Sequence, residues 1–344
     1  MSSANSFGSR FILTSFGESH GLALGAVIDG MPAGIEWNEL LLQKQLERRR
    51  PGTSNIVSGR SEADDPEVLS GVYNGKTLGT PIAIIIRNRD ARSIDYEAIA
   101  KNPRVGHADD LWRAKFGHSD PRGGGRSSGR ETVARVIGGA VALMLIKAIA
   151  PKICIKGFAS HIGPYSLDEK EKALVSSIEP DGFIARFPSE SKCKDIEKLL
   201  IEAKTKGLSY GGVAEVWIDG LPAHLGQPVF HKLKADLASA FMGVGATSSF
   251  ELGDGFEATK TEGSFFHRLG QAESYGGIRG GISTGERIIL RTGFKPTSSV
   301  LNVAKVGRHD PCIVPRAIPV LEAMAALVLA DHILWARQDQ INRI

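Results

Sequence analysis

A weak internal repeat constrains the fold of this chain more than any other feature of its sequence. Residues 26–33 read Ala-Val-Ile-Asp-Gly-Met-Pro-Ala, and residues 216–223 read Val-Trp-Ile-Asp-Gly-Leu-Pro-Ala. Each copy continues into an amphipathic stretch, residues 36–50 and 228–241, and in the second stretch the apolar residues fall at helical spacing. A chain that repeats such a unit is expected to build two similar halves.

Two further landmarks recur in the same order. Gly75 and Gly281 each begin a Gly-x-x-x-Gly turn in front of a strand-like apolar segment, and Arg130 and Arg316 each open a long alanine-rich helix. The offsets between the copies differ among the landmarks, so chance similarity of glycine-rich strands is the alternative. We predict a single domain, 1–344, built from two pseudo-repeats of about 11–150 and 210–340, with a peripheral insert at 151–209.

The predicted fold class is α+β. Strands bounded by glycine turns, with few long helices between them, favour antiparallel layers over a parallel doubly wound sheet. A chain of 344 residues has ample apolar content for a core. The expected architecture is therefore a layered sandwich in which the two long alanine-rich helices lie between antiparallel sheets.

Arginines gather in three places beside glycine or proline, although the net charge of the chain is only +4. Any one gathering is most simply a solvated surface. Three of them in glycine-rich loops favour binding of small polyanions, because the guanidinium fork matches phosphate and carboxylate. Nucleic acid is not expected, since no basic stripe interleaved with aromatic residues occurs. The arginines are Arg48, Arg49 and Arg50, then Arg122, Arg126 and Arg130, then Arg308 and Arg316.

Cysteine usage and hydropathy predict a soluble, cytoplasmic protein. The three cysteines, Cys154, Cys193 and Cys312, form no C-x-x-C pair, so neither a disulfide framework nor a zinc knuckle is expected. The first residues lack a charged-then-apolar signal, and the longest apolar run, 136–150, is broken by two glycines and a lysine. No membrane association is expected.

The most specific local pattern is the glycine-rich segment 123–131. Ser128 and Glu131 have the spacing of a capping box, which predicts a helix start with free backbone N–H groups in front of it. Such a terminus attracts anions, and Arg126 and Arg130 add full charges. We therefore favour an anion site, and an ordinary capped helix with a glycine hinge is the alternative.

Two histidines and one aspartate stand in similar loops, and each alone would be unremarkable. His20 follows Gly-Glu-Ser, His107 follows Gly106, and Asp310 follows Arg-His. The spacing H-E-x-x-H is absent, so no metal site is predicted. Residues 71–77 resemble a Walker A loop but have one residue too few between the glycines, and no dinucleotide fingerprint follows a strand.

Taken in order, these loops resemble the chorismate synthase family over nearly the whole chain. The matching segments are Gly-Glu-Ser-His-Gly at 17–21, Arg-Arg-Arg-Pro-Gly at 48–52, Gly-His-Ala-Asp at 106–109, Gly-Gly-Gly-Arg-Ser-Ser-x-Arg-Glu-Thr at 123–132, Gly-Gly-Ile-Arg-Gly-Gly-Ile-Ser at 276–283, Lys-Pro-Thr-Ser-Ser at 295–299 and Gly-Arg-His-Asp-Pro-Cys at 307–312.

The resemblance implies an anti-1,4-elimination of phosphate from 5-enolpyruvylshikimate-3-phosphate in the shikimate pathway of aromatic amino-acid biosynthesis. It also implies reduced FMN as cofactor and a homotetramer. His20 would act as an acid near the substrate phosphate, His107 would protonate or support the reduced flavin, and Asp310 would act at flavin N5 or in the route of the C6 proton. Histidine suits both tasks because its ordinary pKa is about 6.5.

The resemblance also implies the binding residues. Ser19, Arg49 and Arg130 would hold the substrate, or NADP where a member uses it. The flavin contacts would be Arg126, Ser127, Ser128, Gly245, Ala246, Gly280, Lys295, Pro296, Thr297, Ser298, Ser299 and Arg308.

Three departures from the family pattern affect this expectation. Asn55 stands where the family often has arginine, Gly245 stands where it commonly has asparagine, and the segment between Ser299 and Gly307 is short. Two rival functions follow. One is a bifunctional enzyme that also reduces its flavin with NADPH, which the lack of an extra domain or dinucleotide fingerprint disfavours. The other is a non-catalytic flavin- or anion-binding protein, which the intact histidines and aspartate disfavour.

Overall fold

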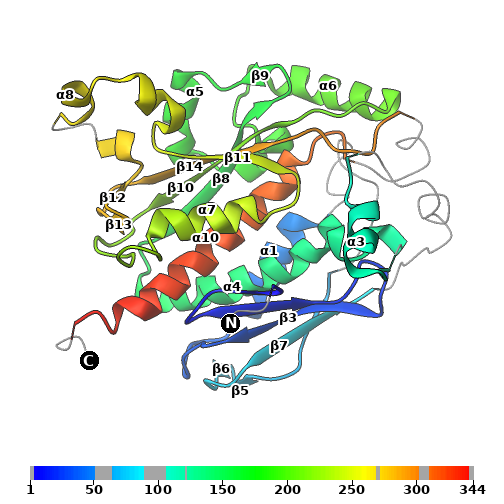
Figure 1. Ribbon diagram of the computed structural model, residues 1–344, viewed down its shortest axis with the longest axis vertical. Helices are drawn as coiled ribbons and strands as arrows, with labels where there is room; N and C mark the ends of the chain where they lie inside the picture. The colour runs from blue at the N-terminus through cyan, green and yellow to red at the C-terminus, as the bar shows by residue number, and fades with distance from the viewer. Residues whose placement is uncertain are drawn as a thin grey trace.

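Two five-stranded antiparallel sheets enclose a layer of helices. The computed structural model describes residues 4–50, 64–88, 106–120, 122–268, 272–301 and 310–340. In Figure 1 one sheet lies at the bottom and the other at the top, with the long helices between them. The predicted α+β sandwich, with its long helices between antiparallel sheets, is confirmed.

The first sheet comes from the N-terminal part of the chain. Alternate residues of its strand Ile82–Arg87, which are Ile82, Ile84 and Ile86, are fully buried, as expected when one face of a sheet covers the core. In spatial order the strands are β1 (Ser6–Phe7), β2 (Ile12–Phe16), β3 (Ala23–Asp29), β7 (Ile82–Arg87) and β4 (Pro66–Val68).

The second sheet has the same plan further along the chain. Its strand Ile288–Phe294 buries Ile288, Leu290, Thr292 and Phe294 and leaves the residues between them half-buried. In spatial order the strands are β11 (Thr247–Leu252), β14 (Ile288–Phe294), β10 (Gly212–Asp219), β8 (Cys154–Ile162) and β9 (Tyr165–Ser166).

Four helices fill the space between the sheets. They are α1 (Glu39–Arg49), α4 (Thr132–Ile149), α7 (Leu233–Met242) and α10 (Val314–Ala336). α4 packs on β2 and β3, α10 packs on β8 and β10, and the two long helices contact each other. At their contact Gly139 lies so close to Ala323 that an added Cβ would be 2.3 Å from the Ala323 Cβ. The backbones of α4 and α10 therefore come close together where the layers of the two sheets join.

The remaining elements are short or peripheral. They are the hairpins β5 (Val72–Tyr73) with β6 (Lys76–Thr77) and β12 (Ile278–Arg279) with β13 (Ile282–Ser283), the helices α3 (Asp109–Phe116), α5 (Glu169–Leu174), α6 (Cys193–Lys206) and α8 (Gly263–Phe266), and the 3-10 turns η2 (Arg122–Ser127), η3 (Gly129–Glu131), η4 (Val175–Ser177), η5 (Pro180–Gly182), η6 (Ile184–Arg186), η7 (Gly255–Lys260) and η8 (Ala272–Tyr275).

The order of elements repeats along the chain. β3, α1, the β5–β6 hairpin, β7 and α4 are followed by β10, α7, the β12–β13 hairpin, β14 and α10. This order is what the predicted duplication requires. The predicted peripheral insert needs one correction, because β8, within 151–209, pairs with β10 and buries Phe158 and Ala159 in the core. The second half therefore begins before β8, and only the part of this segment beyond the sheet can be peripheral.

Two helical segments are long and apolar enough to cross a membrane by composition alone. They are Gly129–Ile149 and Val314–Ala336, and their apolar windows are 72% and 94% buried inside the protein. Their hydrophobic surface is thus used by the core between the sheets.

Candidate active site

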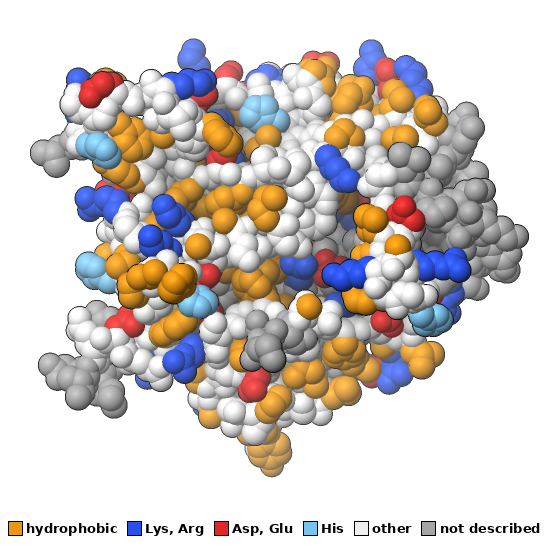
Figure 2. Space-filling view, viewed as in Figure 1, with side chains coloured by type: hydrophobic (Ala, Val, Ile, Leu, Met, Phe, Trp, Pro, Cys, Tyr) orange, Lys and Arg blue, Asp and Glu red, His pale blue; other side chains and the backbone are white. Residues whose placement is uncertain are grey.

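The largest concentration of predicted site residues lies around a cavity of about 820 Å³ where the two halves meet. The surface is hollowed between α7 and α3, and Lys and Arg side chains lie around the hollow (Figure 2). Predicted residues that line the cavity are Arg49, His107, Arg126, Ser127, Ser128, Arg130, Gly245, Ala246, Lys295, Pro296, Thr297, Ser298, Ser299 and Asp310.

The wall in front of α4 is the predicted glycine loop. Gly123, Gly124 and Gly125 have φ angles of 60°, 82° and 51°, which side chains disfavour. Ser128 caps the following 3-10 turn by accepting a hydrogen bond from the Arg130 N–H at 3.3 Å. The predicted capping box is not formed, because Ser128 Oγ accepts from the Arg130 N–H instead of the Glu131 N–H, and the Glu131 carboxylate does not return to the cap. It lies instead against Arg135, one turn along the helix.

Two buried arginines share one carboxylate at the base of the cavity. Asp64 accepts from Arg49 Nη2 and from Arg130 Nη1, each at 2.5 Å. All three side chains are buried, with relative exposures of 1% for Arg49, 2% for Asp64 and 5% for Arg130. Burial raises the pKa of Asp64, but the two guanidiniums outweigh it and lower the pKa below its ordinary range.

A second ion pair stands beside the first. Arg316 Nη1 donates to Asp310 Oδ2 at 2.5 Å. Burial lowers the pKa of Arg49 to about 10, opposed by Asp64 and reinforced by Arg130 and Arg316. Within this cluster three guanidiniums face two carboxylates. Buried Nε and Nη1 of Arg49, and Nε of Arg316, have no hydrogen-bond partner among the described residues, so the cluster has donors and positive charge available for an anion.

The segment 295–299 connects three predicted parts of the site. Lys295 Nζ and Ser298 Oγ donate to the Gly106 carbonyl at 3.0 and 2.9 Å, next to His107. Thr297 Oγ1 donates to the Asp310 carbonyl at 3.0 Å. The Lys295 N–H donates to the Ala246 carbonyl at 3.0 Å. Loops that are far apart in sequence are thereby held on one side of the cavity.

Arg126 and Ser127 form part of the opposite wall. Arg126 Nη2 donates to Ser15 Oγ at 2.5 Å and Nη1 donates to the Gly17 carbonyl at 3.1 Å. Ser127 Oγ donates to the Gly124 carbonyl at 2.6 Å. Both residues also line a neighbouring hollow of about 1320 Å³ beneath α3.

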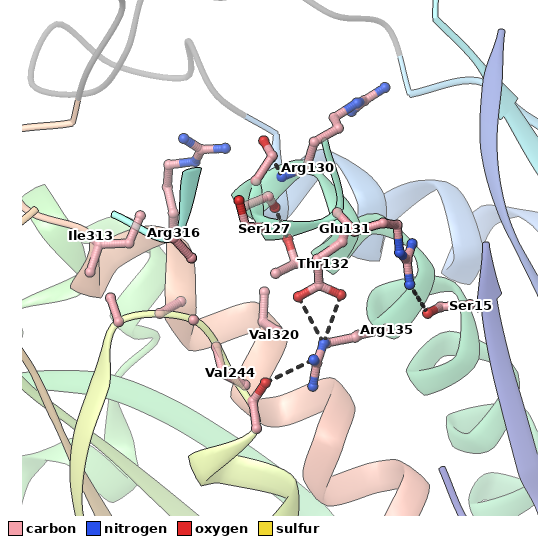
Figure 3. Close-up of a pocket in the computed structure, with 18 of the residues that line it drawn as sticks. Ser15, Ser127, Arg130, Glu131, Thr132, Arg135, Val244, Ile313, Arg316 and Val320 are labelled. Atoms are coloured by element: carbon pink, nitrogen blue, oxygen red, sulfur yellow. Dashed lines mark hydrogen bonds and ion pairs between the residues drawn. The ribbon is translucent and has the colours of Figure 1, made fainter. Parts of the chain in front are cut away.

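Arg135 braces α4 against the loop that follows α7. Its Nε lies 3.0 Å from Glu131 Oε2, and its Nη2 donates to the Gly243 carbonyl at 2.8 Å (Figure 3). Gly243 stands two residues before Gly245 and lines the cavity. Sequence reasoning placed Glu131 in the capping box but did not single out Arg135, which belongs to no loop motif.

Four predicted residues are not on the cavity surface or are not described. His20 and Ser19 are buried behind the glycine loop, with His20 Nδ1 3.2 Å from Ser19 Oγ. An added Cβ at Gly123 would be 2.2 Å from His20 Nδ1, so one glycine separates His20 from the cavity. Gly280 is exposed on the β12–β13 turn and does not line the cavity. Arg308 lies outside the described residues, as does Asn55.

Asp64, which is buried behind two arginines of the cavity wall, is the residue that sequence reasoning missed entirely. It stands 15 residues after Arg49 and 66 before Arg130, so no local spacing connects it with either one. Among the described residues, no group of three or more His, Cys, Asp or Glu side chains is placed to hold a metal ion. The cavity lining is rich in arginine, lysine and hydroxyl donors, which suit an anion, and its titratable groups include His107, Glu131 and Asp310.

Comparisons with known proteins agree with this geometry. A sequence profile described as "Chorismate synthase" matches residues 11–334. The chain is 64% identical over 342 residues to the chorismate synthase of Bdellovibrio bacteriovorus, covering 98% of this chain and 100% of that protein. It is 44% identical to the chorismate synthase of Methanosarcina mazei, with 96% of each chain covered. A solved structure titled "Crystal Structure of Chorismate Synthase" has a TM-score of 0.78 at 30% identity, covering 98% of this chain and 95% of that one.

Proposed function

The chain belongs to the chorismate synthase family of lyases, and we propose that it eliminates phosphate from 5-enolpyruvylshikimate-3-phosphate to give chorismate. In this anti-1,4-elimination the bond from C3 to the phosphate oxygen breaks and a proton leaves C6. The electron pair of the C–H bond becomes part of the new double bond. We further propose that the reaction uses reduced FMN and serves the shikimate pathway in the cytoplasm.

The observation that carries this proposal is the buried cluster of Arg49, Arg130 and Arg316 at the base of the cavity. A substrate with one phosphate and two carboxylates needs several cationic donors, and charge-assisted bonds to guanidinium are strong in a site shielded from water. The unpartnered Nε and Nη1 of Arg49 supply donors beyond those that Asp64 occupies.

The residues around the cavity fit a flavin. A volume of about 820 Å³ is in the range of cofactor sites. The backbone of Gly245 is accessible to a ligand, because the space beside it is open and an added Cβ there would meet nothing within 4 Å. Lys295, with Ser298 and Ser299 beside it, would hold the FMN phosphate, and Arg126 to Ser128 would contact the ring system. When bound, the reduced flavin would supply an electron transiently and recover it, without net oxidation.

The titratable residues have separate roles in this proposal. His20 would protonate the departing phosphate from behind Gly123, where it is buried against Ser19. His107 would hold a proton beside the flavin ring, at the edge of the cavity next to the Lys295 contact. Asp310, fixed by Arg316, would take part in the route of the C6 proton. These are tasks for which histidine and carboxylate groups are suited.

The decisive experiment is anaerobic phosphate release from 5-enolpyruvylshikimate-3-phosphate with dithionite-reduced FMN, oxidised FMN or no flavin. Release only with reduced FMN is expected, and His107→Ala should fold yet lose about 100-fold or more of turnover. Release without any flavin would contradict the cofactor. Wild-type turnover in the variant would remove His107 from the mechanism.

The same assay separates the rival functions. Release with oxidised FMN and NADPH would identify intrinsic flavin reduction, and NADP would then share the substrate arginines. Folded protein that binds reduced FMN but releases no phosphate would indicate a non-catalytic binding protein. We also propose a homotetramer, which light scattering of the purified chain would test.

A further inference from the structure

We propose that Asp64 is a positioning residue that sets Arg49 beside Arg130, so that the two guanidiniums act together as an anion clamp. The inference rests on the proposed function, in which both arginines hold the substrate. Asp64 itself has no part in the sequence pattern that pointed to those arginines.

The geometry of the pair supports the inference. Each oxygen of Asp64 takes one guanidinium, Oδ2 from Arg49 and Oδ1 from Arg130, both at 2.5 Å. Arg49 comes from the C-terminal end of α1, Arg130 from the turn before α4, and Asp64 from just before β4. One carboxylate thus fixes the relative positions of two side chains from unconnected elements.

Charge explains why the pair needs a carboxylate. Arg49 is 1% exposed and is opposed by Arg130 from the start of α4 and by Arg316 from α10. Arg316 is neutralised by Asp310, and the neighbouring Arg48 on α1 turns away to Asp181 and Glu322. Asp64 is therefore the carboxylate that pairs with Arg49 among the described residues.

Removal of Asp64 should therefore act through position. A guanidinium stays protonated in proteins, so Arg49 and Arg130 would keep their charges and repel each other. Without the shared carboxylate the two side chains would move apart, and their donors would no longer converge on one anion.

The experiment measures binding of inorganic phosphate by calorimetry near pH 7, with circular dichroism as a check on folding. Inorganic phosphate is the probe because its binding needs neither flavin nor turnover, so the result does not depend on the proposed reaction. Asp64→Asn removes the charge and keeps the shape, and Asp64→Glu keeps the charge. Glu67→Gln is the matched control, since it breaks an exposed pair with Arg87 on neighbouring strands.

We expect Asp64→Asn to bind phosphate about 10-fold more weakly than the wild type, because the two guanidiniums lose the bonds that hold them together. Asp64→Glu should recover part of the affinity, and Glu67→Gln should bind like the wild type. Unchanged or tighter binding in folded Asp64→Asn would overturn the proposal, because loss of a negative charge alone would favour an anion. If Asp64→Asn does not fold, wild-type affinity in Asp64→Glu would overturn it, because a longer carboxylate cannot hold both guanidiniums in the same places.

Discussion

Single residues in this protein decide how close two functional groups can stand. Gly123 is the clearest case, because its φ is 60° and an added Cβ would be 2.2 Å from His20 Nδ1, so there is no room for a side chain. Asp64 is another, since one carboxylate holds two guanidiniums. At this scale the sequence could indicate the glycines and arginines, whose types are unusual in their loops. It could not indicate Asp64, whose role depends on partners that are distant along the chain.

Gly123→Ala should reduce phosphate release at least 10-fold, because the new Cβ must displace His20 or the loop. The left-handed backbone adds a cost of about 1–2 kcal/mol to folding. Gly75→Ala is the control, with a φ of 72° and nothing within 4 Å of the added Cβ. Both variants should lose thermal stability through the strained backbone, Gly123→Ala more because of its clash, and only Gly123→Ala should lose turnover. Equal turnover in the two variants would show that Gly123 does not keep His20 in place.

Helices and loops in this fold are joined by a few side-chain braces. The helical spacing of residues 228–241 predicted a helix where α7 begins at Leu233, and the stretch 36–50 contains α1. The start of α4 was predicted from Ser128, but not the turn of Glu131 toward Arg135. Periodicity identifies an element because it is a local property. The hydrogen bond from Arg135 to the Gly243 carbonyl joins residues that are 108 positions apart, so no local sequence pattern indicates it.

Arg135→Met should loosen the loop at Gly243 and weaken FMN binding about 10-fold, since one hydrogen bond to a charged group contributes about 1.5–3 kcal/mol. Flavin fluorescence titration would measure the affinity, and hydrogen exchange at residues 243–247 would report the loop directly. Arg87→Gln, which removes an exposed pair far from α7, should change neither. Unchanged exchange in Arg135→Met would argue against a brace.

Glu171 makes the junction of α5 and α6 sensitive to acid. Burial raises its pKa, but bonds from Lys192, Ser189 and the Asp168 N–H outweigh this and lower it to about 2. A depressed carboxyl pKa stabilises the fold above the ordinary value of 4.5, and this contribution is lost as pH falls toward 2. Glu171→Gln should therefore lower the melting temperature at pH 7, by a difference that shrinks between about pH 4.5 and pH 2.

Glu169→Gln is the matched control for this prediction, because Glu169 is on the same helix and 94% exposed. It should melt like the wild type at every pH. A Glu171→Gln deficit that is constant with pH would contradict the titration argument.

At the scale of the whole molecule, one site is assembled from the N-terminal and C-terminal parts of the chain, which the sequence predicts to be two pseudo-repeats. Arg49, Arg126 and Arg130 come from the first half, and Lys295, Asp310 and Arg316 from the second. The repeat in the sequence pointed to this architecture, because strand, turn and helix signals recur in order. The cavity itself was not predictable from either half alone, since it forms where α4 and α10 meet. Gly280 was expected in the site because its motif matches that of the family. Its position is decided by the tertiary fold, which places it on an exposed hairpin turn.

Gly139→Ala should destabilise the whole protein, because the new Cβ would be 2.5 Å from the Ala323 Cα and one helix would have to move. Overpacking of this kind costs about 1–3 kcal/mol, against a gain of about 1 kcal/mol in helix propensity. Scanning calorimetry should show a lower melting temperature. Gly263→Ala, at a helical glycine with open space around it, should not lower it. A melting temperature for Gly139→Ala equal to that of the wild type would show that the layers can separate at no cost.

The close approach of Gly139 to Ala323 has a consequence for how this protein can change over evolutionary time. Because Gly139 lies directly against Ala323, the separation of α4 and α10 there depends on these two residues staying small. Residues that face the cavity, such as Val320 and Met324 on α10, can then vary in shape and polarity one at a time. While the contact between these two residues is kept, the distance between α4 and α10, and with it the width of the cavity, should stay the same as the residues that line the cavity change.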